Sequence, residues 1–302
     1  MRAKQKSYKL VKAFSHQTSG ASSVDFYSRM VAVSTREGVI SVVDVEEGEV
    51  TRTHHCFKYG VNCMRYFHSS EVCAVASAAE GPDAGIWRLW DLHANKFSAV
   101  FRGHDRPVGN LEVHALADVI ISSCEEFSIF WDVRADKVIS KFTDFRSSPI
   151  FEKTQGRYFV AAVEEAKNKS IVLYDIRNFD KPFTNFRFPD IQGNINEIAI
   201  SPDGNLLALT LDDRVMTVDV NRGVLLARSA VLCSPKKPSF NWSSDLLAVS
   251  VDSKDVLLLK VAGLERLQQI SDHQGPASSL FSPTRDLLVT AATGIGLWCP
   301  LS

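Results

Sequence analysis

The sequence predicts an all-β protein made of seven similar four-stranded units, which is a seven-bladed β-propeller. Three observations predict this fold. A cluster of turn residues followed by a β-rich run recurs about every 40 residues, and a period of about 40–45 residues is typical of propeller blades. A second register of apolar strands, most of them ending in Asp, occurs seven times. The last unit lacks room for its fourth strand, whereas an extra strand stands near the N-terminus.

The turn register is clearest in the second half of the chain, where residues 201–210, 241–250 and 282–290 are nearly superimposable. In the first of these segments, Ser-Pro-Asp-Gly at 201–204 precedes Leu-Leu-Ala-Leu-Thr at 206–210. Pro, Asp, Asn and Gly favour turns, and short apolar runs bounded by such residues are typical of strands. Each segment therefore predicts one turn followed by one strand.

The second register consists of strands that end in an aromatic or aliphatic residue followed by Asp. These strand ends are Val43-Asp44, Trp90-Asp91, Trp131-Asp132, Tyr174-Asp175 and Val218-Asp219, and the next two positions hold Leu259-Lys260 and Trp298-Cys299. Their spacing stays close to the period of the turn register. Seven such strands predict seven units.

The third unit shows the four strands that one blade requires. Apolar runs at 108–115, 119–124, 127–133 and 138–142 are separated by turn residues. The runs are rich in Val and Ile and about five to eight residues long, so strands are favoured over helices.

The two ends of the chain are expected to share one blade. The strand predicted at residues 8–14 precedes the first complete unit, and the last unit stops after Trp298-Cys299-Pro300. Pairing the N-terminal strand with the last unit closes the propeller and removes exposed sheet edges. The expected organisation is a flexible basic tail at residues 1–7 and a single propeller domain at residues 8–302.

Composition excludes several classes of function. The net charge of −1 and the pI near 6.7 give no global basic field for nucleic acid. No apolar run approaches the roughly 18 residues of a membrane span. The six cysteines include no C-x-x-C pair, and the adjacent His54 and His55 point to opposite faces of a strand. We expect no metal, no cofactor, no membrane association and no sequence-specific nucleic-acid binding.

One histidine stands where it can lock a blade. The residues concerned are Gly103-His104, Ser122, Ser123, Glu125 and Glu126. The Gly-His dipeptide and the Trp-Asp pairs resemble those of WD40 repeats, and this resemblance implies that His104 bonds an acid in a turn, here Glu125 or Glu126. A catalytic Ser-His-acid triad is the alternative, but no G-x-S-x-G elbow accompanies these residues. We interpret His104 and Glu125 as structural and expect no catalytic centre.

The segment Trp131-Asp132-Val133-Arg134 has two interpretations. In the structural one, Asp132 locks the blade by capping the end of its strand. In the other, Trp131, Asp132 and Arg134 form an adaptor box, because the segment resembles the WD-x-R motif through which substrate receptors dock onto cullin-type ubiquitin ligases.

A cationic rim is predicted on one propeller face, where the loops between second and third strands meet the loops between blades. In this register the rim consists of Arg36, Lys58, Arg106, Arg146 and Arg214. Arginine side chains match the geometry of phosphate groups, so the rim suits a phosphorylated peptide. Acidic residues interleaved with the rim reduce its field, and scattered solvated charge is the alternative.

Three strings go beyond a generic WD40 repeat. They are KYGV at 58–61 with RY at 65–66, LHANK at 92–96, and LYDIRNFDK at 173–181. They resemble the WD-repeat subunit shared by the COMPASS histone methyltransferase complex and the PNUTS–phosphatase transcription-termination complex. Departures from the repeat are Lys260, Cys299 and a turn lengthened at 80–83.

The resemblance implies a nuclear, non-catalytic scaffold that works with RNA polymerase II. Its implied partners are histone methyltransferase or phosphatase-targeting subunits and the phosphorylated polymerase tail, with the chain as a monomer within a larger complex. The alternative function is a substrate receptor of a cullin-type ubiquitin ligase.

Overall fold

The computed structural model of the chain describes residues 7–15, 20–145, 147–165, 168–188, 193–230, 235–251, 254–271, 273 and 277–301. In these residues the strands form seven four-stranded sheets, numbered here as blades 1–7. The fold is the seven-bladed β-propeller that the sequence predicts. The chain divides into two compact units, one of Ser22–Ile198 and the other of Met1–Ala21 with Ala199–Ser302.

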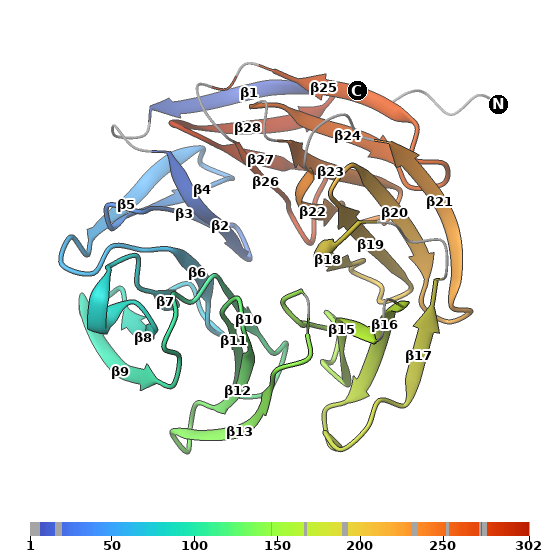
Figure 1. The fold of residues 1–302 in the computed structure, drawn as a ribbon. Coiled ribbons are helices and arrows are strands. Elements are labelled where there is room, and N and C mark those ends of the chain that lie inside the picture. Colours follow the sequence, from blue (N-terminus) through green and yellow to red (C-terminus); the bar gives the residue numbers. More distant parts are fainter. Residues whose placement is uncertain are drawn as a thin grey trace. The chain divides into compact units, whose positions relative to one another are not determined.

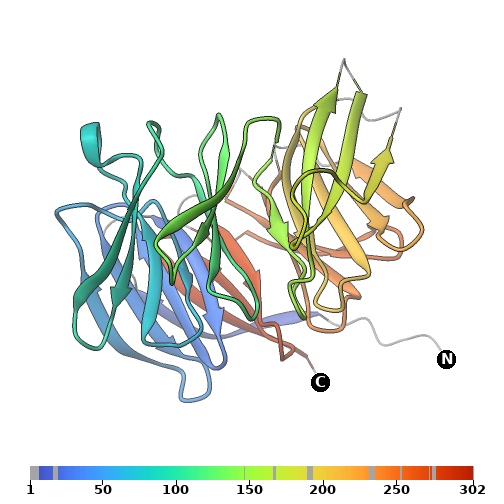
Figure 2. The same ribbon diagram turned by 90° about the horizontal axis from the view of Figure 1, so that it is seen from below.

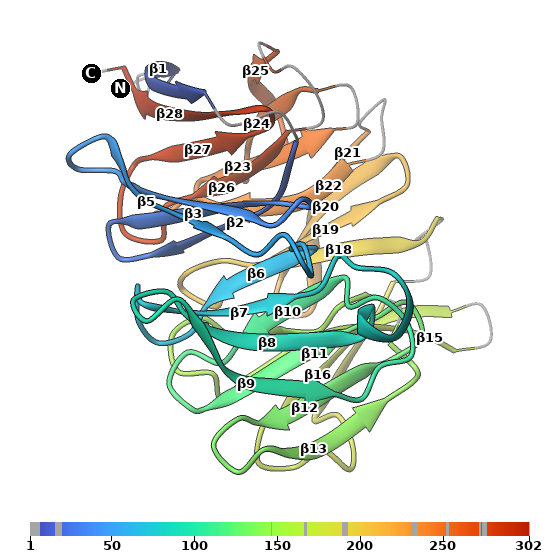
Figure 3. The same cartoon turned by 90° about the vertical axis from the view of Figure 1, so that its left-hand side faces the viewer.

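The unit Ser22–Ile198 holds blades 1–4, and Figure 3 shows the strands of blade 2 side by side in chain order. Blade 1 contains β2 (Ala21–Tyr27), β3 (Met30–Thr35), β4 (Val39–Asp44) and β5 (Glu49–His55). Blade 2 contains β6 (Cys63–Tyr66), β7 (Val72–Ala76), β8 (Ile86–Asp91) and β9 (Lys96–Arg102). Blade 3 contains β10 (Asn110–Val113), β11 (Val119–Ser123), β12 (Ser128–Asp132) and β13 (Lys137–Phe142). Blade 4 contains β14 (Ile150–Phe151), β15 (Tyr158–Glu165), β16 (Asn168–Asp175) and β17 (Thr184–Arg187).

The second unit holds blades 5–7. Blade 5 contains β18 (Ile195–Ile200), β19 (Leu206–Leu211), β20 (Arg214–Asp219) and β21 (Val224–Ala230). Blade 6 contains β22 (Pro235–Phe240), β23 (Leu246–Val251), β24 (Val256–Lys260) and β25 (Arg266–Ile270). Blade 7 contains β26 (Ser278–Phe281), β27 (Leu288–Ala291), β28 (Gly294–Pro300) and β1 (Tyr8–Ser15). The boundary between the units falls within β18.

The lengthened turn predicted at 80–83 contains η1 (Gly81–Asp83), a short 3-10 turn between β7 and β8 (Figure 2). The guanidinium of Arg88 on β8 donates to the carboxylate of Asp83 at 2.9 Å. The same guanidinium lies over the ring of Tyr59, 3.7 Å from its centroid. Because Arg88 is buried, this pairing anchors the insertion to the blade.

Burial follows the position of a strand within its blade. All six residues of β4 are buried, whereas exposed and half-buried residues alternate along the outermost strand β21. Inner strands packed on both faces read as continuous apolar runs. An outermost strand retains a solvent-facing side, which explains the alternation.

The hydrophobic core of each unit lies between neighbouring blades. Blades 2 and 3 meet at Trp87, Phe101 and Trp131, and the rings of Trp87 and Phe101 stack with centroids 3.9 Å apart. Blades 6 and 7 of the other unit meet at Leu258 and Phe281. Burying one such side chain contributes about 1.5–3 kcal/mol, so blade-to-blade packing is a main source of stability.

Six blades share a bulge opposite the third strand, within the described residues. The outermost strand carries one extra residue there, and these residues are Val11, Thr51, Ser98, Ile139, Leu226 and Leu267. In blades 1 and 2 the extra side chain donates to a third-strand carbonyl, from Thr51 to Val42 at 3.1 Å and from Ser98 to Leu89 at 3.4 Å. The bulge therefore belongs to the repeat itself.

The N-terminal strand completes the last blade, as predicted. β1 pairs antiparallel with β28 from Tyr8 opposite Pro300 to Ser15 opposite Gly294 (Figure 1). Tyr8 is 3% exposed, and its backbone N–H donates to the side chain of Gln268 at 2.7 Å. β1 begins where the sequence predicts the propeller to begin, and residues 1–6 of the predicted basic tail lie outside the described residues.

Candidate functional site

A hydrogen-bond chain in blade 3 joins His104, Ser122 and Trp131. Nε2 of His104 lies 2.6 Å from Oγ of Ser122, and Nε1 of Trp131 donates to the same Oγ at 2.7 Å. An indole N–H can only donate, so the Ser122 oxygen accepts from Trp131. Because a serine oxygen can accept two hydrogen bonds and also donate one, either the serine hydroxyl or Nε2 of His104 can supply the proton of the second bond.

The surroundings of His104 favour its neutral form. Burial, together with the smaller effect of the nearby Lys141, lowers the pKa of His104 to about 4. The imidazole stacks on the ring of Phe127 with centroids 4.8 Å apart and planes 9° apart. At neutral pH the ring is thus an uncharged part of the packing.

The structure places Ser122, and not Glu125, beside His104. Nδ1 of His104 makes no hydrogen bond among the described residues. Glu125 is exposed, and Glu126 pairs with Arg106 at 3.4 Å. The sequence correctly places acids in this turn, but the expected bond between His104 and Glu125 is not formed.

The accessibility of Ser122 shows whether this serine has a structural role in the blade or could act as a catalytic nucleophile. Ser122 is fully buried, and its oxygen is occupied by two hydrogen-bond partners. A nucleophile must reach a substrate atom, whereas this hydroxyl only joins neighbouring strands. Blade 7 repeats the device, with Nε1 of Trp298 donating to Oγ1 of Thr290 at 2.9 Å.

Asp132 caps the turn after β12, since its Oδ1 accepts the backbone N–H of Ala135 at 2.8 Å. The equivalent aspartates accept turn amides in the same way, and they are Asp44, Asp91, Asp175 and Asp219. Of the predicted adaptor box, Trp131 is buried, Asp132 is half-buried and Arg134 is exposed. Arg134 is thus the member of that box that faces solvent.

Some residues of the predicted cationic rim form ion pairs with carboxylates, whereas others do not. Arg106 pairs with Glu126 at 3.4 Å, and Arg214 pairs with Asp213 at 2.7 Å. Arg36 and Lys58 are exposed and have no carboxylate partner among the described residues. Arg36, Lys58 and Arg106 belong to the unit Ser22–Ile198 and Arg214 to the other unit, while Arg146 lies outside the described residues.

The structure brings together a cluster of charged residues within the unit Ser22–Ile198 that is not evident from the sequence. Its members are Asp25, Arg65, Glu112, Lys153 and Glu197. The buried guanidinium of Arg65 donates to Ser23 at 3.2 Å, to the Met64 carbonyl at 2.7 Å and to Asn110 at 3.3 Å.

Burial and charge oppose each other in this cluster. Burial raises the pKa of Asp25, and Arg65 lowers it. Burial raises the pKa of Glu197 to about 7, again against the effect of Arg65. Glu112 is ion-paired with Lys153. The arrangement binds first strands of neighbouring blades through paired charges.

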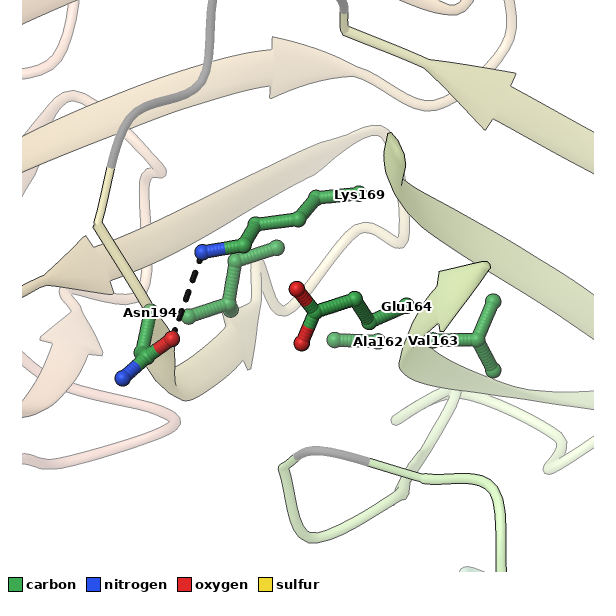
Figure 4. A pocket seen from close by; sticks show the side chains of 6 residues that line it. Ala162, Val163, Glu164, Lys169 and Asn194 are labelled. Atoms are coloured by element: carbon green, nitrogen blue, oxygen red, sulfur yellow. Dashed lines mark hydrogen bonds between the residues drawn. The ribbon is translucent and has the colours of Figure 1, made fainter. Parts of the chain in front are cut away.

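A shallow hollow of about 190 Å³ lies beside the β15–β16 hairpin, lined by Ala162, Val163, Glu164, Lys169, Asn194 and Ile195 (Figure 4). Nζ of Lys169 donates to Oδ1 of Asn194 at 3.3 Å and to the carbonyl of Gly193. The lysine therefore fastens two segments together. The space open to water molecules within the hollow is only about 10 Å³, far below the roughly 300–1,000 Å³ typical of small-molecule sites.

The two adjacent histidines contact different neighbours. The ring of His54 packs edge-on against Trp90, and the ring of His55 stacks on Phe57. Within the described part of the chain, no three His, Cys, Asp or Glu side chains are grouped as metal ligands. Nor does any helix there have the length and apolar character to cross a membrane.

The fold and the Trp–Ser–His lock define the class of protein, a WD40-repeat β-propeller. One solved structure, described as the mitotic checkpoint complex, matches 99% of this chain and 94% of its own chain with a TM-score of 0.78 at 16% identity. At that identity the likeness shows the fold alone. No protein-family model matches the sequence.

Among curated proteins, the chain is similar to WD repeat-containing protein 82 of Drosophila melanogaster. The two are 26% identical over 98% of this chain and 96% of the relative. An uncharacterised WD repeat-containing protein of Schizosaccharomyces pombe is 23% identical over 64% of this chain and 59% of its own length. A transcriptional corepressor of Arabidopsis thaliana is 22% identical over 67% of this chain but only 24% of its own length.

Proposed function

We propose that the chain is a nuclear, non-catalytic scaffold subunit of a complex that acts with RNA polymerase II, of the histone methyltransferase or phosphatase-dependent termination type. The observation that carries this proposal is the similarity to the Drosophila relative over nearly the full length of both chains. The strings at 58–66, 92–96 and 173–181 support it, because they resemble the WD-repeat subunit shared by those complexes.

A scaffold role also agrees with the chemistry of blade 3. The neutral His104 and the fully buried Ser122 serve the packing of the blade, so neither is placed to attack a substrate. The function then lies in surfaces that bind other proteins, as is usual for rigid folds that carry binding residues on their loops.

The cationic rim is the proposed contact for the phosphorylated polymerase tail. Arg36 and Lys58 are available for this contact, whereas Arg106 and Arg214 first have to exchange Glu126 and Asp213 for phosphate. Exposed ion pairs contribute only about 0–1 kcal/mol, so such an exchange is inexpensive. Arg146 is the remaining member of the proposed rim.

The test of the tail contact is a titration of matched phosphorylated and unmodified tail peptides at increasing salt. We expect the phosphorylated peptide to bind more tightly, to weaken as salt screens the rim, and to weaken further when Arg106 and Arg214 are both changed to Glu. Equal binding of the two peptides, or no effect of the double change, would exclude the rim as the phosphate site.

Affinity purification of the tagged chain from nuclear extract, followed by mass spectrometry, tests the scaffold role. Methyltransferase, phosphatase and polymerase components are the expected partners. Recovery of cullin adaptor proteins instead would favour the alternative, a substrate receptor of a cullin-type ligase, which the exposure of Arg134 after the capped Asp132 supports. In that case Arg134→Glu should abolish the recovery.

A further inference from the structure

The β3–β4 loop of blade 1 and the loop between blades 1 and 2 carry an exposed aromatic side chain and two exposed cations. Phe57 is 69% exposed, more than any other Phe, Tyr or Trp among the described residues. The neighbouring Lys58 and Arg36 are also exposed and lack a carboxylate partner among the described residues. The one acid in these turns is the exposed Glu37, so the surface of Arg36, Glu37, Phe57 and Lys58 keeps a net positive charge.

The backbone that carries these side chains is fixed by contacts between the two loops. The N–H of Cys56 donates to the carbonyl of Gly38 at 2.6 Å. Gly38 has φ +93°, and a Cβ there would lie 2.4 Å from the Cys56 carbonyl oxygen. Gly60 has φ +62°, and a Cβ there would lie 2.3 Å from the Arg36 carbonyl oxygen. Only glycine permits both the backbone conformation and this close approach.

The aromatic ring of Phe57 is part of a wider platform. The imidazole of His55 stacks on it with centroids 5.0 Å apart. Lys58 follows Phe57 in the sequence, and its Nζ lies 5.0 Å from the centroid of the Tyr59 ring. The Tyr59 ring also packs against the guanidinium of Arg88. Lys58 thus lies beside an aromatic ring, on a loop whose backbone is already in place, which lowers the entropy that binding must cost.

From this geometry we infer that Arg36, Phe57 and Lys58 form a docking surface for an extended acidic segment of a partner subunit that carries an aromatic side chain. The partner's aromatic ring would stack on Phe57, and its flanking Asp or Glu carboxylates would pair with Arg36 and Lys58. The inference rests on the scaffold role proposed above, and it names one surface and one class of partner for that role. Where Arg36 and Lys58 hold this partner, the contact with the phosphorylated tail falls to the other members of the rim, Arg106 and Arg214 among them.

Neighbouring charge and position in the fold separate this surface from three other exposed apolar residues, which are Leu116, Val11 and Ile139. Leu116 is 71% exposed but stands in a turn with Asp118 and has no cation beside it in sequence. Val11 and Ile139 are the extra residues of the bulges in β1 and β13, where the bulge itself accounts for their exposure. Phe57 has no such structural reason to face solvent.

The test is selection of a random peptide library displayed on phage against the full chain, with Phe57→Ala as the counter-selection. Peptides that need Phe57 should contain an aromatic residue flanked by Asp or Glu. Titrated against the purified chain, they should bind about 30-fold more weakly to Phe57→Ala, the loss typical of a hot spot. Changing Arg36 and Lys58 together to Glu should weaken binding about tenfold or more and flatten its salt dependence.

Leu116→Ala is the matched control, since it removes a side chain of similar exposure from another loop and should leave affinity unchanged. The proposed docking surface would be refuted if no selected peptide depends on Phe57. It would also be refuted if the peptides that depend on Phe57 are basic, neutral or without an aromatic residue. The scaffold role would survive that result if the unaltered chain still recovers polymerase-linked partners from extract. If peptides that depend on Phe57 are selected but the affinity purification recovers no nuclear partners, the scaffold role would be refuted and the docking surface would stand.

Discussion

Replacing His104 with Ala removes one hydrogen bond and one ring stack from blade 3. The bond to Ser122 is worth about 1 kcal/mol, because Ser122 keeps the indole N–H of Trp131 as a partner. The stack on Phe127 contributes about 1 kcal/mol more. We therefore expect His104→Ala to lower the free energy of unfolding by about 2 kcal/mol at neutral pH.

The same substitution should change how stability depends on pH. The folded pKa of His104 is about 4 and its ordinary value is 6.5, so the unfolded chain binds the extra proton first as pH falls. The contribution of a neutral, buried His104 is complete above pH 6.5 and is lost as pH falls toward 4. This loss reaches about 2 kcal/mol near pH 5, where the unaltered chain and the variant should become about equally stable.

Urea unfolding followed by tryptophan fluorescence, at about pH 7.5 and about pH 5, measures both effects. His93→Ala is the control, because His93 is exposed and its loss should change stability at neither pH. The reasoning fails if His104→Ala costs less than about 0.5 kcal/mol at neutral pH, or if its deficit is the same at both pH values.

Three further changes test other parts of the fold. Deleting residues 1–15 should expose the edge of the last blade and produce aggregates in light scattering; a monomer with an unchanged Tm would contradict the closure. Gly156→Ala would place a Cβ 2.1 Å from Nε2 of His114 at a φ of +66°, so calorimetry should show a loss of more than about 1 kcal/mol. Arg65→Met leaves the carboxylate of Asp25 without its cation and should cost about 3–5 kcal/mol in urea unfolding; a neutral effect would show that the charge cluster is not structural.

The sequence is sufficient for the fold because each blade repeats the same local signals. A turn cluster, an apolar strand and a capping Asp recur at one period, so errors in single elements do not accumulate. Strand ends in blade 3 differ from the prediction by one or two residues, with β10 at Asn110–Val113 inside the predicted run 108–115. The missing fourth strand of the last unit was enough to assign β1.

The sequence could not supply the partner of His104 or the charge cluster. It shows that acids occupy the turn at 125–126, but not that Glu125 faces solvent while Ser122 meets the imidazole. Asp25, Arg65 and Glu112 lie on first strands of three different blades. A charged residue within one strand is normally taken as solvent-facing, and only a comparison of equivalent positions between repeats could have indicated a shared location.

The bulge that recurs in six blades bears on how the protein avoids self-association. A straight outermost strand offers its free backbone groups as a template for a strand of another molecule. The extra residue interrupts the regular alternation of these groups and increases the local twist. Val11, Ile139 and Leu226 are exposed and apolar at these positions, where a regular edge strand would attract further strands. The bulge in the repeat thus protects the outermost strands against edge-to-edge aggregation. Removing the extra residue from one outermost strand would create a regular, aggregation-prone edge while leaving the core unchanged.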